Sequence, residues 1–370
     1  MPGEPNYFPM PRTAGSVSAI TLTPGKTDYA SELQFAIDNM ITGTVGRVEL
    51  APSPTPYPLS KTIVIPANES GFVAFNGNGA TLRATKPMES LIRFGGQKSM
   101  STYTFENVHL DAANRAAYGF IGIRLNQRTG LIRGVSVSGA RRSGFWLRAC
   151  QAGVFASCSS TNNRQYGFLI EGGFVARFLQ CTSDGNGLDG FRIASLKSTP
   201  EDTEPFFSEA GAEQWGQGPE LLDCVSSNNE RDGISIGRPP LEGFATPGTA
   251  LFNTTLSNAS IAGNTRHGLR LLGDAYGVLI TNSTITPGPK TVAWASAAYV
   301  DPREDTNRFI RARLPRGDKP VLEYQSPVLT FVETRVKPWP NAPRWTLTGD
   351  ATTPDLKVNL FGASDGWVVA

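Results

Sequence analysis

The sequence is poor in the residues that build metal centres and redox sites. It has two histidines and four cysteines in 370 residues, with no CxxC pair and no histidine at metal-ligand spacing from a cysteine. This scarcity argues against a zinc site and against a disulfide framework. We therefore expect no resident metal and no cofactor.

Long apolar runs and clustered charges are missing as well. No segment approaches the roughly 18 consecutive apolar residues that would span a bilayer. Residues 1–22 lack both the basic leader and the apolar run of a secretory signal. The formal net charge of +2 has no obvious cluster behind it. The sequence thus predicts no membrane insertion, no signal peptide and no nucleic-acid partner.

The residues that are abundant favour strands and turns. Glycine (39 residues) and proline (27) are typical of a chain with many turns and few long helices, while a hydrophobic content of 39% allows a substantial core. Elongated β architectures commonly run to this length as one unit. We therefore expect an all-β protein.

A glycine followed by a large apolar residue returns at a spacing of about 23 residues, with two longer intervals that fit the period plus an insertion. A repeat this short cannot bury a core of its own, so it must stack on its neighbours. The pattern predicts a solenoid of β-coils. The repeated glycines are Gly119, Gly144, Gly167, Gly190, Gly233 and Gly268.

Three further columns keep the same register: an asparagine four residues before the glycine, a small residue nine before it, and a large apolar residue directly after it. Asparagine tolerates the left-handed backbone region, and its amide can bond the equivalent asparagine one coil away. Glycine lets the chain enter the next strand without a Cβ clash. We expect the apolar and the small residues, three of them cysteines, to face the core. The columns are Asn163, Asn186, Asn229 and Asn264; Val135, Cys158, Cys181, Cys224 and Ala259; and Phe120, Phe145, Phe168, Phe191, Ile234 and Leu269.

The segment before the repeat resembles a known family. The stretches "TDYASELQFAIDNM", "GRVELAPSPTPYPLSKTIVIP" and "NGNGATLRAT" are similar to the amino-terminal part of the pectate-lyase-like superfamily of right-handed parallel β-helices. The resemblance implies a single-stranded right-handed parallel β-helix at 44–286. It also implies a short capping helix at about 28–41, within an N-terminal segment 1–43. We expect residues 287–370 to form a small β-rich region that caps the last coil or joins subunits.

The same resemblance implies a group of activities. The superfamily includes polysaccharide lyases, hydrolases, epimerases and non-catalytic virion proteins, so the fold does not select among them. Phage tailspikes are similar in layout, which implies a virion-associated or extracellular protein that binds and cleaves a bacterial surface polysaccharide. It implies a homotrimer attached to tail or capsid proteins too. A non-catalytic structural or receptor-binding virion protein, and a secreted polysaccharide lyase or epimerase, stay open, as does the choice between hydrolase and lyase.

The residue before the repeated glycine is ionisable in three successive coils, at Asp189, Asp232 and His267. Regular stacking would place neighbouring members about 5 Å apart. Two carboxyls at that distance can share a proton, so we predict these residues as the catalytic acid, base and third member. Polygalacturonase-like hydrolases carry an Asp-Asp pair that this sequence lacks, and Asp before Gly also occurs in ordinary turns. A purely structural role is the alternative.

Two insertions, at 197–218 and 238–249, leave consecutive coils at the same point and should emerge side by side. We predict that they wall a glycan site, with Trp215 as a stacking platform. Carboxylates there would bond sugar hydroxyls, or hold calcium, which their spacing does not decide. Alternatively the loops are solvated decoration. A positive group is also needed to neutralise an acidic sugar, and Arg231 and Arg266 are available. The predicted substrate-binding residues are Trp215, Glu204, Glu209, Glu213 and Arg192.

Overall fold

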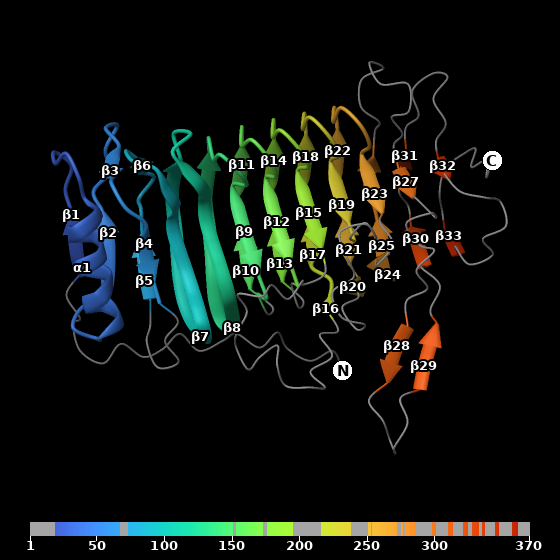
Figure 1. The fold of residues 1–370 in the computed structure, drawn as a ribbon, viewed down its shortest axis with the longest axis horizontal. Helices are drawn as coiled ribbons and strands as arrows, with labels where there is room; N and C mark the ends of the chain where they lie inside the picture. Colours follow the sequence, from blue (N-terminus) through green and yellow to red (C-terminus); the bar gives the residue numbers. More distant parts are fainter. Residues whose placement is uncertain are drawn as a thin grey trace, which may run out of the picture.

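The computed structural model describes a stack of parallel strands that follow one another along the long axis of the molecule (Figure 1). Strands of one coil pair with the equivalent strands of the next, so the coils form a parallel β-helix. The described residues are 19–66, 73–150, 153–172, 176–194, 216–237, 251–252, 254–271, 275–276, 278–285, 298–300, 310–313, 321–324, 328–332, 335–336, 345–347 and 357–361.

One helix is present among the described residues, α1 (Ala30–Ile41), close to the predicted 28–41. The Asp28 carboxylate accepts a hydrogen bond from the Ala30 amide at 3.0 Å. It thereby satisfies a free N–H group at the helix start and places a negative charge at the positive end of the helix dipole. Apolar residues recur at helical spacing on the face that packs against the first coil. These buried residues are Leu33, Ala36, Ile37 and Met40.

The helix segment contacts two strands near the start of the stack, β3 (Tyr57–Leu59) and β4 (Ile63–Ile65). The Tyr29 amide donates to the Pro58 carbonyl at 2.8 Å. The Gln34 side chain takes the place of a neighbouring strand, because its Nε2 donates to the Val64 carbonyl and its Oε1 accepts from the Val64 amide, both at 2.8 Å. The expected capping role of the helix is confirmed at this end of the stack.

Three parallel sheets run the length of the stack, and each coil contributes a strand to each. The long strands β7 (Met88–Asp111) and β8 (Ala116–Ser138) pass through all three. Sheet I contains β1 (Ala19–Leu22), β2 (Arg47–Leu50), β5 (Val73–Asn76), β10 (Val154–Ala156), β13 (Arg177–Leu179), β17 (Glu220–Leu222), β21 (Thr255–Ser257) and β25 (Val278–Thr281). Sheet II contains β3, β6 (Thr81–Ala84), β11 (Ser159–Thr161), β14 (Thr182–Asp184), β18 (Val225–Ser227), β22 (Ser260–Ala262) and β26 (Thr284–Ile285). Sheet III contains β4, β9 (Phe145–Arg148), β12 (Phe168–Glu171), β15 (Phe191–Ala194), β19 (Ile234–Ile236) and β23 (Leu269–Leu271).

The strand stack extends beyond both ends of the recognisable repeat. At the start, β1 precedes the helix and pairs with β2. Past residue 286, all three sheets continue in parallel, although the repeat letters are lost. The division at residues 43 and 286 stays a prediction. The later strands are β27 (Ala298–Val300) and β32 (Trp345–Leu347) in sheet III, β30 (Val328–Val332) and β33 (Lys357–Phe361) in sheet I, and β31 (Arg335–Val336) in sheet II.

Two smaller sheets complete the described strands. A parallel sheet joins the short strands β16 (Gly216–Gln217), β20 (Leu251–Phe252) and β24 (Ala275–Tyr276). An antiparallel pair joins β28 (Ile310–Arg313) and β29 (Val321–Tyr324).

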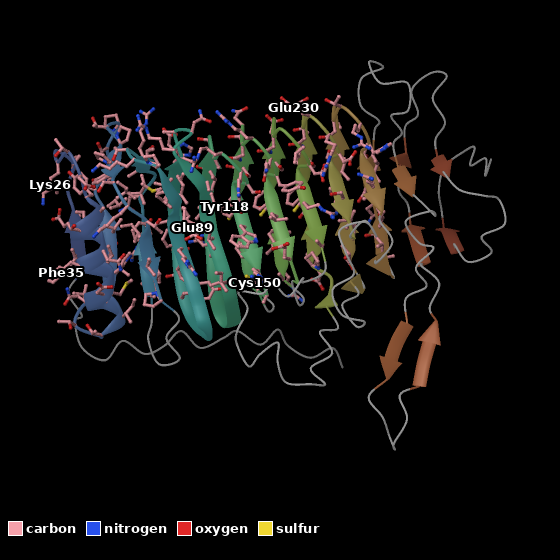
Figure 2. The ribbon with its side chains drawn as sticks, in the orientation of Figure 1. Lys26, Phe35, Glu89, Tyr118, Cys150 and Glu230 are labelled. Atoms are coloured by element: carbon pink, nitrogen blue, oxygen red, sulfur yellow. The ribbon has the colours of Figure 1, made fainter. Side chains whose placement is uncertain are left out.

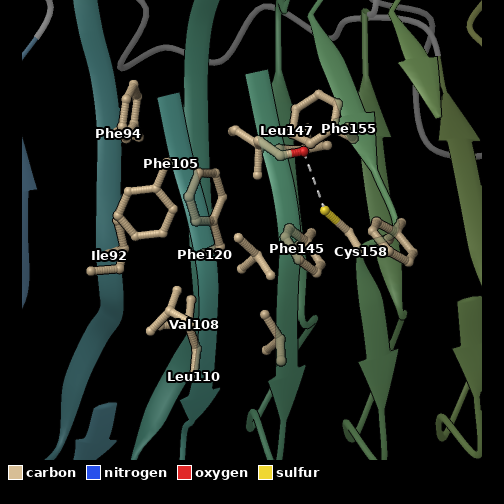
Figure 3. Packing of buried hydrophobic residues seen from close by; sticks show 14 of the residues in the cluster. Ile92, Phe94, Phe105, Val108, Leu110, Phe120, Phe145, Leu147, Phe155 and Cys158 are labelled. Carbon is tan, nitrogen blue, oxygen red and sulfur yellow. Dashed lines mark hydrogen bonds between the residues drawn. The ribbon is translucent and has the colours of Figure 1, made fainter. Parts of the chain in front are cut away.

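The core consists of ladders of identical side chains. Phe168 stacks on Phe145 and on Phe191, with ring centroids 4.6 Å and 4.7 Å apart and nearly parallel planes. Phe155 and Phe178 form a second ladder at 4.9 Å. All five rings are fully buried, and Figure 3 shows Phe145 and Phe155 facing into the coil interior. The predicted inward orientation of the residue after the glycine is confirmed, and these stacks add aromatic contacts to hydrophobic burial.

The cysteine column is part of the same core. Cys158, Cys181 and Cys224 are buried and free, and each thiol approaches a backbone carbonyl one coil back. In Figure 3 the thiol of Cys158 points to such a carbonyl. Burial raises the pKa of the Cys181 thiol. A protonated, buried thiol is unreactive, so the prediction of small core residues is confirmed.

Stacked asparagines hold one corner of each coil. The Asn186 side-chain amide donates to Oδ1 of Asn229 at 2.9 Å, and the Asn186 backbone amide donates to the same oxygen at 3.1 Å. Asn163 repeats both bonds to Asn186, and Asn229 repeats both to Asn264. The predicted bond between stacked asparagines is confirmed, and all four side chains are buried.

The expected left-handed backbone at the ladder asparagines is wrong by one residue. The residue just before each one has the positive φ instead: Asn162 (54°), Gly185 (63°), Asn228 (53°) and Gly263 (69°). The ladder asparagine itself must point inward to bond its neighbour. The residue before it therefore makes the sharp turn, and asparagine and glycine tolerate that conformation best.

The repeated glycine is required by a close approach between coils. A Cβ atom on Gly167 would lie 2.0 Å from Ser183 Oγ and 2.9 Å from Asn186 Nδ2. Ser183 Oγ in turn donates to the Gly190 carbonyl at 2.9 Å and accepts from Asn186 Nδ2 at 2.9 Å. The predicted Cβ clash is confirmed, and its partner is a serine three residues before the ladder asparagine.

We expect truncation of the phenylalanine ladder to cost more stability than truncation of the asparagine ladder. Phe168→Ala removes a fully buried ring and should lower the free energy of unfolding by about 3–5 kcal/mol. Asn186→Ala should lower it by about 1–3 kcal/mol, because buried hydrogen-bond partners are left unpaired. Urea denaturation followed by circular dichroism measures both. Negligible losses at both positions would contradict the register described here.

Candidate functional site

The outer face of sheet III carries the ionisable residues that the repeat predicts. Strand register aligns one outward column across five coils, because the residues two after each repeated glycine pair with one another. The residue just before each glycine forms a second column beside it. The first column is Trp146, Leu169, Arg192, Ser235 and Arg270. The second is Tyr118, Ser143, Tyr166, Asp189, Asp232 and His267.

The Asp189 carboxylate is buried and hydrogen-bonded at both oxygens. Arg231 of the next coil donates from Nε to Oδ1 at 2.5 Å and from Nη2 to Oδ2 at 2.6 Å. The Ser235 hydroxyl donates to Oδ2 at 2.5 Å and the Asp232 amide to Oδ1 at 3.2 Å. Burial alone would raise the pKa of Asp189, but the hydrogen bonds and charges of Arg231, Ser235 and Arg192 outweigh it and lower the pKa.

The Asp232 side chain is equally buried but has fewer hydrogen bonds. Its Oδ1 accepts from the His267 backbone amide at 3.1 Å, whereas its Oδ2 accepts no hydrogen bond within the described part of the chain. Burial and the charge of Asp189 raise the pKa of Asp232 to about 6, against the opposite effect of the arginines. The guanidinium nitrogens nearest to its oxygens are those of Arg270 at 3.7 Å, Arg231 at 3.8 Å and Arg266 at 3.9 Å.

The structure therefore brings Asp189, Asp232 and Arg192 together, with His267 next to Asp232. Arg192 is buried, with 6% of its surface exposed, and its Nη1 lies 3.4 Å from Ser235 Oγ. The catalytic roles of Asp189, Asp232 and His267 and the binding role of Arg192 stay predictions. We call the group the Asp–Arg cluster: Asp189, Arg192, Arg231, Asp232, Ser235, Arg266 and Arg270.

Sequence reasoning missed Ser235 and Arg270, and it did not pair Arg231 with Asp189. The register contained a usable signal, because Ser235 and Arg270 stand two residues after a repeated glycine, as Arg192 does. Arg231 and Arg266 stand two residues before one. Parallel strands bring equal offsets together, so the register places these side chains in neighbouring columns, although it does not specify which aspartate each arginine bonds.

The predicted loop residues Trp215, Glu204, Glu209 and Glu213 lie outside the described residues, so their role stays a prediction. The described chain stops just before each insertion, after the neighbouring strands β15 and β19 of sheet III. The amide of Gly237, the last described residue before the second insertion, donates to the Ile193 carbonyl at 2.9 Å. That the two insertions emerge side by side stays a prediction.

His109, the second histidine, lies on sheet II and takes no part in this cluster. Its Nδ1 is 2.7 Å from Ser136 Oγ and its Nε2 is 3.2 Å from Ser138 Oγ. Burial lowers the pKa of His109, while the charge of Asp111 partly opposes that shift. Across the described part of the chain, no group of three or more His, Cys, Asp or Glu side chains could hold a metal ion. Within the same ranges no helix has the length and apolarity needed to cross a membrane.

The opposite pKa shifts of the two aspartates predict opposite pH dependence of stability. The native state binds the Asp232 proton more tightly than the unfolded chain does, because the pKa rises from 3.8 to about 6. Its contribution to stability is therefore full below pH 3.8 and falls by about 3 kcal/mol as the pH rises to 6. Asp232→Asn removes this loss. The variant should gain stability relative to the parent between pH 4 and 6 in urea denaturation.

Asp189→Asn is the matched control. Because the native pKa of Asp189 is lowered, the ionised form contributes stability above the unfolded pKa of 3.8, and that contribution is lost as the pH falls through the native value. Removing one partner of this buried ion pair should cost about 3–5 kcal/mol at pH 7. The same pH profile in both variants would contradict these assignments.

Comparison with known proteins was made on sequence and on structure. The family described as "Right handed beta helix region" matches residues 64–205 and, in a second overlapping alignment, 121–287. Together these matches cover more than half of the chain. No curated protein matches the sequence.

Similar solved structures share the fold at low sequence identity. The A-module of the mannuronan C-5 epimerase AlgE4 of Azotobacter vinelandii is 16% identical, with a TM-score of 0.56, over 92% of this chain and 94% of that one. The polygalacturonase of Erwinia carotovora is 13% identical, with a TM-score of 0.56, over 94% and 93%. A tailspike protein of the E. coli bacteriophage HK620, solved with a hexasaccharide, is 14% identical, with a TM-score of 0.50, over 92% and 62%. With the coils, the register and the family match in agreement, the chain belongs to the right-handed parallel β-helix family.

Proposed function

We propose that this chain is a tailspike-like protein, virion-associated or extracellular, that binds and cleaves a bacterial surface polysaccharide on the outer face of sheet III. The observation that carries the proposal is Asp232, a buried carboxyl with one unbonded oxygen and three arginines within 4 Å. Carboxyls with a pKa moved toward neutrality are typical of acid–base catalysts. Solved structures of the same fold include a polygalacturonase, a mannuronan epimerase and a tailspike bound to a hexasaccharide, which supports a glycan ligand.

The two aspartates suit different roles. With a pKa near 6, Asp232 can hold or release a proton at neutral pH. In a hydrolase it would protonate the glycosidic oxygen, and in a lyase its ionised form would accept the sugar C5 proton. Asp189 is engaged by Arg231 at both oxygens, so it serves better to position that guanidinium. Arg266 and Arg270 would stabilise negative charge that develops on the sugar.

A non-catalytic glycan-binding or structural protein is the second candidate. The observation in its favour is that both aspartate side chains are fully buried, and that Asp189 has hydrogen bonds at both oxygens. Such a group can act simply as a bridge between coils. The two candidates differ in what happens when the charge of Asp232 is removed.

Asp232→Asn should abolish turnover without harming the fold. We expect a loss of about 10²-fold or more, as for removal of a general acid or base, with stability at pH 7 equal to or above that of the parent. Purified protein is incubated with mannuronan, polygalacturonate and a panel of capsular polysaccharides and lipopolysaccharides. New reducing ends mark hydrolysis, and new ultraviolet absorbance marks an unsaturated lyase product.

Leu179→Ala, on the outer face of sheet I, is the control for unrelated surface changes. Cleavage by the parent and by Asp232→Asn at equal rates would remove Asp232 from the mechanism. Binding of a polysaccharide without any product from the parent would favour the second candidate.

The tailspike assignment carries its own expectation, a homotrimer that attaches to virion tail or capsid proteins. Light scattering after gel filtration should then give three times the 39.7 kDa of one chain. The trimer should also adsorb to bacteria that display the bound polysaccharide. A monomer at micromolar concentration would overturn the trimer and would favour a secreted lyase, hydrolase or epimerase.

A further inference from the structure

We infer that Tyr118 and Trp146 form a second sugar-binding position, on the N-terminal side of the Asp–Arg cluster, for a distant unit of the same polysaccharide. This inference rests on the proposed function and deepens it, because it states the direction in which the bound polymer extends. The ligand is a pyranose ring, which offers an apolar C–H face and a rim of hydroxyl groups.

The two rings are stacked with centroids 5.0 Å apart and planes 27° from parallel. Each has a polar partner: Trp146 Nε1 donates to Glu171 Oε2 at 2.8 Å, and Arg142 Nη1 donates to the Tyr118 hydroxyl at 3.3 Å. The Arg142 guanidinium also lies 6.0 Å from the centre of the Tyr118 ring. Because these contacts hold both rings in place, little ordering would be needed on binding.

This pair differs from the other ring contacts of the described residues. Those contacts join fully or nearly fully buried rings of the core cluster, whereas neither Tyr118, which is 8% exposed, nor Trp146 belongs to that cluster. Trp146 is half-buried on the outer face of β9. Tyr118 lies on β8, near the middle of the stack in Figure 2. Trp146 is thus the part of the pair that a sugar would contact, with Tyr118 packed behind it and the Glu171 carboxylate beside it to bond hydroxyl groups.

The aromatic pair and the Asp–Arg cluster lie on the same face of the stack, several coils apart. Trp146 stands in the outward column that continues through Leu169 and Arg192 to Ser235. Three strand steps of ~4.8 Å separate Trp146 from Ser235, or about 14 Å along the stack. Tyr166 lies between, with the Arg231 guanidinium 5.7 Å from its ring centre. The face is thus aromatic toward its N-terminal side and ionic toward its C-terminal side.

This arrangement fits a linear polymer that lies along the stack axis. The unit at the Asp–Arg cluster would be the one that reacts, and a unit further along the polymer would contact Trp146. A short oligosaccharide placed at the cluster cannot reach 14 Å, so chain length should decide whether Trp146 contributes. A residue that only holds the fold together would affect short and long ligands alike.

The test compares disaccharides with hexasaccharides of two series, oligomannuronate and oligogalacturonate, by calorimetry on the full chain. Asp232→Asn serves as background, so that nothing is cleaved. For the Asp232→Asn protein with no second change, we expect tighter binding of a hexasaccharide than of the disaccharide of the same series. Adding Trp146→Ala should weaken hexasaccharide binding about tenfold, as expected for a lost aromatic contact, and leave disaccharide binding unchanged.

Trp146→Phe and Leu179→Ala are the controls. Phe keeps a ring and should retain most of the affinity, while Leu179→Ala should behave as the parent. Equal hexasaccharide affinity with and without Trp146 would overturn the second sugar-binding position. It would also be overturned if, in both series, the hexasaccharide bound no more tightly than the disaccharide. Cleavage that depends on Asp232 but is indifferent to Trp146 would leave the proposed function standing without this inference. A parent that neither binds nor cleaves any glycan would remove both.

Discussion

The structure depends on one close contact, in which the backbone of a repeated glycine lies against a serine and an asparagine of the next coil. At Gly167 there is no room for a Cβ atom beside Ser183 and Asn186. The contact leaves that serine and asparagine bonded to one another and to the backbone, so neither buried side chain lacks a partner. Gly144 and Gly190 repeat the contact, so these three coils turn at the same point and begin their sheet III strands at the same height.

Because the corners are alike, residues at the same distance from the repeated glycine in the sequence lie above one another in successive coils. The residue after the glycine enters the core, where Phe145, Phe168 and Phe191 stack at 4.6–4.7 Å. The residues before and two after it point outward, where the same regularity concentrates charge. Asp189 and Asp232 occupy equivalent places in adjacent coils, yet differ in their bonds. Ser235 follows Asp232 and serves Asp189, while the next coil offers Arg270 in place of a serine. Asp189 also has two short bonds from Arg231, whereas the equivalent Arg266 lies 3.9 Å from Asp232, so two aspartates in one column differ in pKa.

The columns were predictable because each allows only one kind of residue. The sequence repeats three residues at fixed intervals: a glycine that has no space for a Cβ atom, an apolar residue that stacks in the core, and an asparagine that bonds the equivalent asparagine of the next coil. The left-handed residue was misplaced by one position, since Asn162 and the ladder residue Asn163 are adjacent and alike. The Asp189–Arg231 pair was not predicted, because a long outward side chain chooses its partner from several coils. Strands beyond residue 286 were expected, but not that they continue the parallel sheets, because strand pairing by backbone bonds does not require the repeated glycine and asparagine.

The side chain of Gln34 has a consequence for how such molecules meet each other. An open strand edge is a template that accepts any extended chain, and a parallel stack has one at each end. At Val64 the donor and the acceptor are already occupied by one carboxamide, which presents the same pair of groups as a peptide bond. The first strand of sheet III therefore has no free backbone donor and acceptor at Val64. An incoming strand finds no free pair of backbone groups at this position, so Gln34 protects the first coil of sheet III against head-to-tail growth into fibres.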